Sequence, residues 1–170
     1  KGRFILGLGS QIRPHITKRF SMPWSKPAAR MEDMVTAIKA ILNAWQNESR
    51  LEHRGEFYNH TLMTPLFNPG PNPHGIPKIY VAAVGPLMTK AVARSADGLL
   101  AHPFNTPTYL KNITLPLIDE ALSSVNKQKD AFDLSISVMT GIGATEESHK
   151  KAVRACRDQV AFYASTPNYR

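Results

Sequence analysis

The chain has 170 residues, of which 42% are hydrophobic and 20% charged, and its net charge at pH 7 is +8. This composition is typical of one soluble globular domain and excludes a disordered chain. The only cysteine, Cys156, excludes an internal disulfide and a multi-cysteine metal site, and we expect it to be a buried thiol. No apolar run is long enough to span a membrane and no leader precedes the first predicted strand, so we expect a cytoplasmic location.

The positive charge raises the possibility of nucleic-acid binding. The basic residues are dispersed along the chain, and the longest cluster, residues 149–151, follows Glu146 and Glu147 on a predicted helix. No zinc-finger or RNA-recognition signature is present. We therefore expect neither nucleic acid nor membrane as a partner, and a basic surface that helps to collect an anionic cofactor.

The first half of the chain predicts a strand, a helix and a loop excursion. Residues 2–9 have the pattern of a buried strand. Apolar residues then recur every three or four positions over residues 28–45, which predicts a helix with Pro27 in its first turn and Ser25 as its cap. Residues 47–77 contain five prolines and predict an excursion with a short hairpin around residues 54–58.

Residues 78–98 form the most informative segment. An apolar run from Ile79 to Val84 breaks at Gly85-Pro86, continues as an alanine-rich helix and stops at Asp97-Gly98 before a second apolar run. This order predicts a βαβ unit. Its glycine turn leaves backbone N–H groups free at a helix N-terminus, an arrangement that attracts a phosphate.

The second half repeats the alternation of strands and helices. Thr106-Pro107 predicts the start of a helix that is kinked at Pro116, and residues 132–139 predict a strand. Thr145 is the expected cap of a last helix, whose apolar stripe includes Cys156 and Tyr163.

The β-α-β-α order implies a parallel sheet, either doubly wound and open or part of a (β/α)8 barrel. A complete barrel takes about 250 residues. We therefore predict an α/β fold in which residues 1–170 form one partial TIM-barrel domain of four βα units, with the excursion at 47–77.

In such folds the functional residues lie at the carboxyl ends of the parallel strands. These positions carry glycine turns, hydrogen-bond donors and two histidines, but no carboxylate pair, no activated nucleophile and no metal cluster. A cofactor is therefore expected to supply the chemistry. The candidate residues are Gly9, Ser10, Gln11, Arg13, His15, Gly85, Pro86, His102, Asn105 and residues 140–143.

Several segments, taken in order, resemble the luciferase-like monooxygenase superfamily, in particular its flavin- and deazaflavin (coenzyme F420)-dependent oxidoreductases. Residues 11–24 are similar to the actinobacterial deazaflavin branch, although Thr17 stands where relatives often have an acidic residue. The other matching segments are Gly2-Arg3-Phe4-Ile5-Leu6-Gly7-Leu8-Gly9-Ser10, Pro27 with Arg30-Met31, Gly55-Glu56-Phe57-Tyr58, Val81-Ala82-Ala83-Val84-Gly85-Pro86 and Ala96-Asp97-Gly98.

The resemblance implies a TIM barrel of which strands four to seven are present, and hydride transfer or oxygen insertion on a small organic substrate. Coenzyme F420 or FMN is the implied cofactor, with its phosphate held by loops after the middle strands. The cofactor-binding residues would be Gly9, Ser10, Ala83, Val84, Gly85 and Pro86. Arg13, His15 and His102 would face the substrate or the ring, and no metal is expected.

Two other functions fit the residues. One is a non-catalytic module that binds phosphate or nucleic acid, and the other is a barrel enzyme acting on a phosphorylated metabolite. We expect a homodimer for the full-length protein. Because a half barrel leaves two sheet edges unpaired, we also expect this segment to be inactive without the remaining strands.

Overall fold

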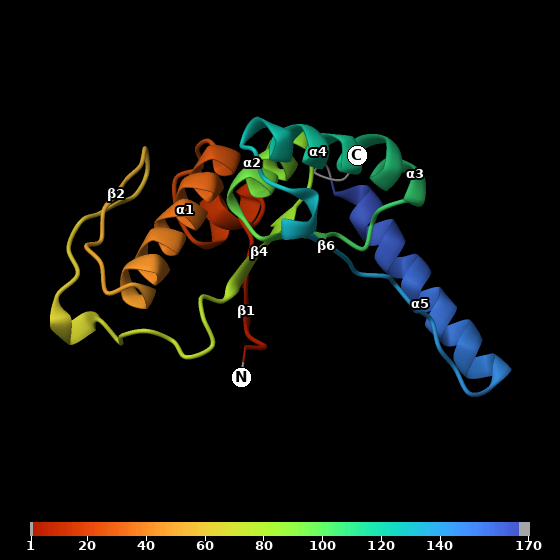
Figure 1. The fold of residues 1–170 in the computed structure, drawn as a ribbon. Helices are drawn as coiled ribbons and strands as arrows, with labels where there is room; N and C mark the ends of the chain where they lie inside the picture. Colours follow the sequence, from red (N-terminus) through yellow and green to blue (C-terminus); the bar gives the residue numbers. More distant parts are fainter. Residues whose placement is uncertain (1, 167–170) are drawn as a thin grey trace.

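A computed structural model describes residues 2–166 and shows one parallel sheet with helices on one of its faces (Figure 1). The sheet has the order β1-β4-β5-β6, and all three neighbouring pairs are parallel. Its strands are β1 (Ile5–Leu8), β4 (Lys78–Ala83), β5 (Gly98–Ala101) and β6 (Asp133–Ile136). The predicted α/β architecture with parallel crossovers is therefore confirmed.

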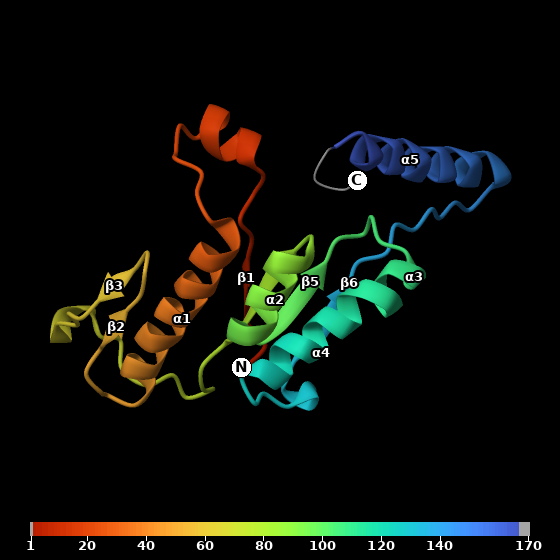
Figure 2. The same cartoon turned by 90° about the horizontal axis from the view of Figure 1, so that it is seen from above.

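Helices follow the strands, and those that connect two strands of the sheet lie on the same face of it (Figure 1). They are α1 (Pro27–Gln46), α2 (Pro86–Ser95), α3 (Pro107–Tyr109), α4 (Leu115–Ser124) and α5 (Glu146–Ser165). Short elements complete the described chain: the π-helical turns η1 (His15–Arg19) and η3 (Leu110–Thr114), the 3₁₀ turns η2 (Pro65–Phe67) and η4 (Lys129–Ala131), and the strands β2 (His53–Arg54) and β3 (Asn59–His60). Helices α1, α2 and α4 lie over the sheet, whereas α5 projects away from it (Figures 1 and 2).

The core lies between the sheet and its helical layer. Alternate strand residues such as Ile79, Val81 and Leu99 point into this layer and are fully buried against residues such as Val35 and Val92. Burying one such side chain stabilises a fold by about 1.5–3 kcal/mol. This alternation fixes which side chains face the opposite, uncovered side of the sheet.

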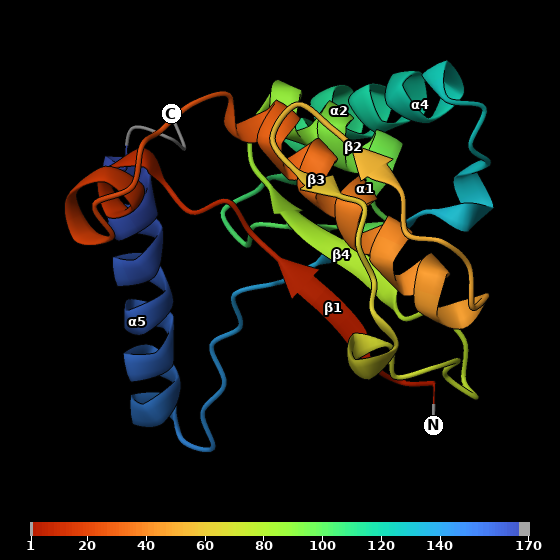
Figure 3. The same cartoon turned by 90° about the vertical axis from the view of Figure 1, so that its left-hand side faces the viewer.

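The uncovered side carries the other half of the alternation. Tyr80 and Leu100 are half-buried there, and Ala82 is exposed. Strand β1 lies at the edge of the sheet, so 69% of Phe4 and 47% of Ile5 is exposed. The prediction that residues 2–9 form a buried strand is therefore correct for the strand and wrong for its burial (Figure 3).

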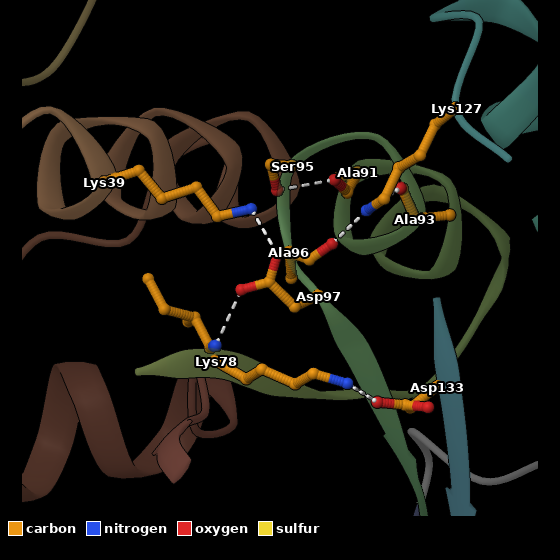
Figure 4. A network of polar contacts seen from close by, with 10 residues as sticks. Lys39, Lys78, Ala91, Ala93, Ser95, Ala96, Asp97, Lys127 and Asp133 are labelled. Carbon is orange, nitrogen blue, oxygen red and sulfur yellow. Dashed lines mark hydrogen bonds and ion pairs between the residues drawn. The ribbon is translucent and has the colours of Figure 1, made fainter. Parts of the chain in front are cut away.

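Asp97 ties the βαβ unit to the helical layer (Figure 4). Its carboxylate accepts hydrogen bonds from the Ile79 backbone N–H at 2.8 Å and from Lys39 Nζ at 2.7 Å. Lys127 donates to the carbonyl of Ala96 at the end of α2. The sequence predicted Asp97 only as a helix stop, but this carboxylate also joins β4 to α1.

One helix cap differs from the prediction, and the kink expected at Pro116 stays a prediction. Helix α1 begins after Lys26, which has a left-handed φ of 39°, and Ser25 does not cap it; the Ser25 hydroxyl accepts instead from Arg30. Pro116 lies inside a helix that continues through it, directly after the π-helical turn η3. The wider turn accommodates the prolyl ring and the missing N–H group.

The end of the described chain is less buried than predicted. Strand β6 is shorter than the predicted strand at 132–139: it ends at Ile136, which is 44% exposed, and Val138 beyond it is 76% exposed. No residue of α5 is buried, and Cys156 is half-buried, so the expectation of a buried thiol is wrong. The predicted cap is confirmed, because Thr145 and Ser148 form a reciprocal capping box. None of the described helices has the length and hydrophobicity that crossing a membrane requires.

The excursion folds back onto α1 through one carboxylate. Asp33 of α1 accepts from the backbone N–H groups of Phe57 and Tyr58, at 2.6 and 3.1 Å, and lies 2.7 Å from His53 Nε2. A side chain on Gly55 would collide with this carboxylate. The predicted hairpin is thus confirmed as β2 and β3, and Asp33 anchors it.

Candidate functional site

The candidate site lies at the carboxyl ends of the strands, toward η1 and α5 (Figure 2). Gly9 and Ser10 follow β1, and Val84 to Pro86 follow β4, which is the neighbouring strand. A Cβ atom on Gly9 would lie 3.8 Å from the Cβ of Ala82, so the two strand ends are in contact. The structure therefore brings the predicted cofactor residues of both loops together.

The N-terminus of α2 provides backbone donors at this edge. Gly85 precedes the helix with φ 82° and ψ 160°, a conformation that only glycine adopts without strain. Because Pro86 has no N–H group, the first free donors are those of Leu87 and Met88, which lack an intrahelical acceptor. The carbonyl of Gly85 points into the helix and accepts from Thr89 N and Oγ1.

The loop residues contribute in different ways. Ala83 is buried in the core, so only its backbone faces the site, whereas 44% of Val84 is exposed at the strand end. The turn is open, since a Cβ atom on Gly85 would meet nothing within 4 Å. A ligand could therefore approach the backbone of residues 83–86 closely.

His102 follows β5 and is held by its own loop. The Phe104 backbone N–H donates to His102 Nδ1 at 3.1 Å, and the His102 carbonyl accepts from the Asn105 side chain. The neutral ring therefore carries its proton on Nε2. Burial lowers the pKa of His102, which keeps the ring neutral near pH 7.

His15 begins η1, which projects from the strand ends (Figures 2 and 3), and Arg13 lies two residues before it. Arg13 is exposed, and its carbonyl accepts from Thr17. His15 Nδ1 is buried and has no hydrogen-bond partner within residues 2–166. These two residues share the carboxyl side of the sheet with the two loops, and their roles stay predictions.

Tyr163 of α5 meets two rings of the loop after β5 at the same edge of the sheet. The Tyr163 ring meets the His102 ring edge-on, with centroids 4.5 Å apart, and lies 6.3 Å from the Phe104 ring. The sequence predicts for Tyr163 only a place on an apolar helix stripe. Its proximity to His102 depends on where α5 docks, and no local sequence pattern carries that information.

The site combines anion-attracting backbone groups with a neutral imidazole and aromatic rings. Its segments, residues 9–15, 83–88 and 102–105, contain no aspartate or glutamate that would repel a phosphate. Nor do the described residues bring together three or more His, Cys, Asp or Glu side chains able to hold a metal ion. Such a site can bind an anionic ligand with a planar ring, and the described groups alone supply no general acid and base pair.

Comparison with known families places this architecture in one class of protein. The luciferase-like monooxygenase family matches residues 1–170. The chain belongs to the luciferase-like monooxygenase family, as its motifs predicted.

Two relatives are similar to this protein over most of the chain. An uncharacterized protein of Mycobacterium tuberculosis is 48% identical over 100% of the chain and 50% of its own length. A 5,10-methylenetetrahydromethanopterin reductase of Archaeoglobus fulgidus is 29% identical over 95% of the chain and 44% of its own length. The chain thus spans about half the length of the curated relatives it matches.

Solved structures support the fold. The coenzyme F420-dependent tetrahydromethanopterin reductase of Methanopyrus kandleri matches with a TM-score of 0.70 and 19% identity, over 96% of this chain and 48% of that one. An F420-dependent secondary alcohol dehydrogenase matches with a TM-score of 0.60 and 20% identity, over 79% and 39%. The four βα units therefore correspond to about half of a luciferase-like barrel.

Proposed function

We propose that the chain is part of an oxidoreductase that uses coenzyme F420 or FMN and acts on a small organic substrate. The observation that carries the proposal is the open glycine turn at Gly85, which presents backbone donors at a strand end next to the turn at Gly9. The names of the relatives support the same class, since a glucose-6-phosphate dehydrogenase of Intrasporangium calvum described as F420-dependent is 28% identical over 81% of the chain.

The residues present fit such a cofactor. A phosphate group would lie against the N–H groups of Leu87 and Met88, where the helix dipole favours a negative charge. His15 Nδ1 is a second point of fit, because a buried polar atom without a partner costs about 1–3 kcal/mol. Either a bound ring or a segment outside residues 2–166 would satisfy it.

Each candidate residue has a distinct task in this proposal. The backbones of Gly9, Ser10 and residues 83–86 would bind the phosphate. His102 would donate a hydrogen bond from Nε2 at the mouth of the barrel, and Arg13 and His15 would approach the ring or substrate from η1. The cofactor, when bound, supplies hydride transfer or oxygen activation, and the chain orients it and excludes water.

A fluorescence titration with paired ligands tests the proposal. The 170-residue chain is titrated with F420, with its phosphate-free deazaflavin riboside, with FMN and with riboflavin. We expect saturable binding of one ring system, at least about tenfold tighter for the phosphorylated member of that pair.

Two results would contradict the proposal. Equal affinity for both members of each pair would show that the α2 N-terminus does not bind the phosphate group. Binding of inorganic phosphate with no preference for either ring would instead favour the non-catalytic phosphate module. Three points stay predictions: the use of F420 or FMN as the cofactor, the formation of a homodimer and the cytoplasmic location.

A further inference from the structure

We propose that Tyr163 is a positioning residue for His102, and that α5 thereby completes the mouth of the candidate site. The inference rests on the proposed function in one respect only: it takes His102 to be a residue of the site. The sequence pattern alone indicates for Tyr163 no more than a place on an apolar stripe.

Within residues 2–166, the Phe104 N–H group and the Tyr163 ring both contact the His102 imidazole. The Phe104 N–H group occupies Nδ1, which sets the tautomer but still permits rotation about the side-chain bonds. The Tyr163 ring meets the imidazole at an interplanar angle of 81° with centroids 4.5 Å apart, an edge-to-face arrangement that aromatic pairs favour. Together the contacts hold the imidazole in one orientation, with Nε2 as the donor.

The packing of helix α5 against the preceding loop brings the Tyr163 ring to His102. Gly141 and Gly143 lie so close to α5 that a Cβ atom on either would meet the backbone of residues 148–153 at 3.3 Å or less. This close approach fixes the first half of the helix against the loop after β6. Its last turns then reach back to the loop after β5, where Tyr163 is half-buried.

The contact also explains why His102 is shielded from water. The pKa of His102 is lowered by burial and not by a charged neighbour. Tyr163 is one of the rings that provide this burial. Removing the ring should therefore expose the imidazole to water and free its rotation.

The neighbouring aromatic residue provides a matched control. Phe162 packs on Tyr163 with ring centroids 5.4 Å apart, but 67% of it is exposed. Tyr163→Ala and Phe162→Ala each delete one aromatic ring from the same turn of α5. Tyr163→Phe keeps the ring and removes only the hydroxyl group.

NMR titration of the His102 imidazole in the 170-residue chain tests the inference without any cofactor. In the unmodified chain and in Phe162→Ala and Tyr163→Phe, we expect a midpoint below the ordinary value of 6.5. In Tyr163→Ala the midpoint should rise toward that value. An unchanged midpoint in Tyr163→Ala, in a variant whose circular dichroism matches the parent, would overturn the proposal, as would an equal rise in Phe162→Ala.

Cofactor titration separates this inference from the proposed function. If the chain binds F420 or FMN, Tyr163→Ala should weaken the affinity by up to about tenfold and Tyr163→Phe should restore it. Unchanged affinity in Tyr163→Ala would overturn the role of α5 in the site. If the unmodified chain binds neither cofactor, the proposed function fails, while the NMR result still decides whether Tyr163 positions His102.

Discussion

A single glycine on the uncovered side of the sheet, Gly98, allows three neighbouring strands to pack closely. Gly98 lies between Tyr80 and Asp133 on adjacent strands, and the Tyr80 hydroxyl donates across it to the Asp133 carboxylate. A Cβ atom on Gly98 would lie 2.8 Å from both the Tyr80 ring and the Asp133 carbonyl. Glycine is therefore required here by close packing and not by its backbone angles.

This packing makes a prediction that has a control in the same sheet. Gly98→Ala should lower the free energy of unfolding by about 1–3 kcal/mol, because the added methyl group forces Tyr80 and β6 apart. Gly7→Ala adds the same group to β1 on the same side, where it meets nothing within 4 Å. We expect Gly7→Ala to leave stability unchanged or to raise it by up to about 1 kcal/mol. Urea unfolding followed by circular dichroism measures both, and equal losses would contradict the packing argument.

Carboxylates were the hardest residues to predict. No sequence pattern indicates a role for Asp33, and the sequence predicts Asp97 only as a helix stop. Their partners, His53, Phe57 and Tyr58 for one and Lys39 and Ile79 for the other, lie 18 to 58 residues away in the sequence. Only the folded chain brings such pairs together, so no local sequence motif predicts them.

Among the elements, the hairpin β2–β3 depends on Asp33. Burial alone would raise the pKa of Asp33, but hydrogen bonds from the Phe57 N–H, His53 and the Tyr58 N–H outweigh burial and lower the pKa below 3.8. A carboxylate with a lowered pKa contributes stability above its unfolded pKa, and this contribution is lost as the pH falls through the folded value. The hairpin should therefore loosen as the pH falls below about 4.

Hydrogen exchange of the Phe57 and Tyr58 amides tests this anchor. Asp33→Asn should speed the exchange of both amides at pH 7 by about tenfold or more, since a charge-assisted hydrogen bond is replaced by a weaker one. Glu56→Gln removes a charge from the same hairpin but breaks only the exposed pair with Lys26. Because exposed ion pairs contribute about 0–1 kcal/mol, this control should change exchange little. A similar effect in both variants would show that Asp33 is no special anchor.

Elements defined by local signals were predicted well. The strand, glycine turn and helix at residues 78–95 appear within about one residue of expectation, because apolar periodicity, Gly85 and Pro86 act within one segment. The burial of β1 was predicted wrongly, and so was the length of the last strand, which was expected over residues 132–139 and spans Asp133–Ile136. Burial depends on what covers a strand, and the alternation in its sequence does not reveal whether a covering layer is present within the chain.

At the scale of the whole molecule, the sheet formed by residues 2–166 has two free edges and one uncovered side within that range. The chain spans about half the length of its relatives, so in a complete barrel further strands would pair with β1 and β6. The 170-residue chain should instead self-associate through these edges. Ile5, at the edge and 47% exposed, is a suitable position to test this.

Sedimentation velocity measures the effect of blocking the β1 edge. Ile5→Lys should reduce self-association, because a charged side chain opposes pairing with another strand, and it should not lower stability. Leu66→Lys is the control, since Leu66 is 87% exposed but lies in η2, outside the sheet. Equal reduction by both variants would show that general hydrophobicity, and not the strand edge, drives association.

Helix α5 has one further consequence for the whole molecule. None of its own residues is buried, and outside the contacts of Tyr163 and the close approach of Gly141 and Gly143 it is stabilised by its cap and by ion pairs within the helix, such as Glu146–Lys150 and Glu147–Lys151. We expect such a segment to open and close in its own local equilibrium, separate from global unfolding. The apparent dissociation constant of any ligand that needs Tyr163 in place is the intrinsic constant divided by the fraction of molecules with α5 docked. Affinity at the mouth could therefore be tuned by substitutions far from the ligand that change only this population.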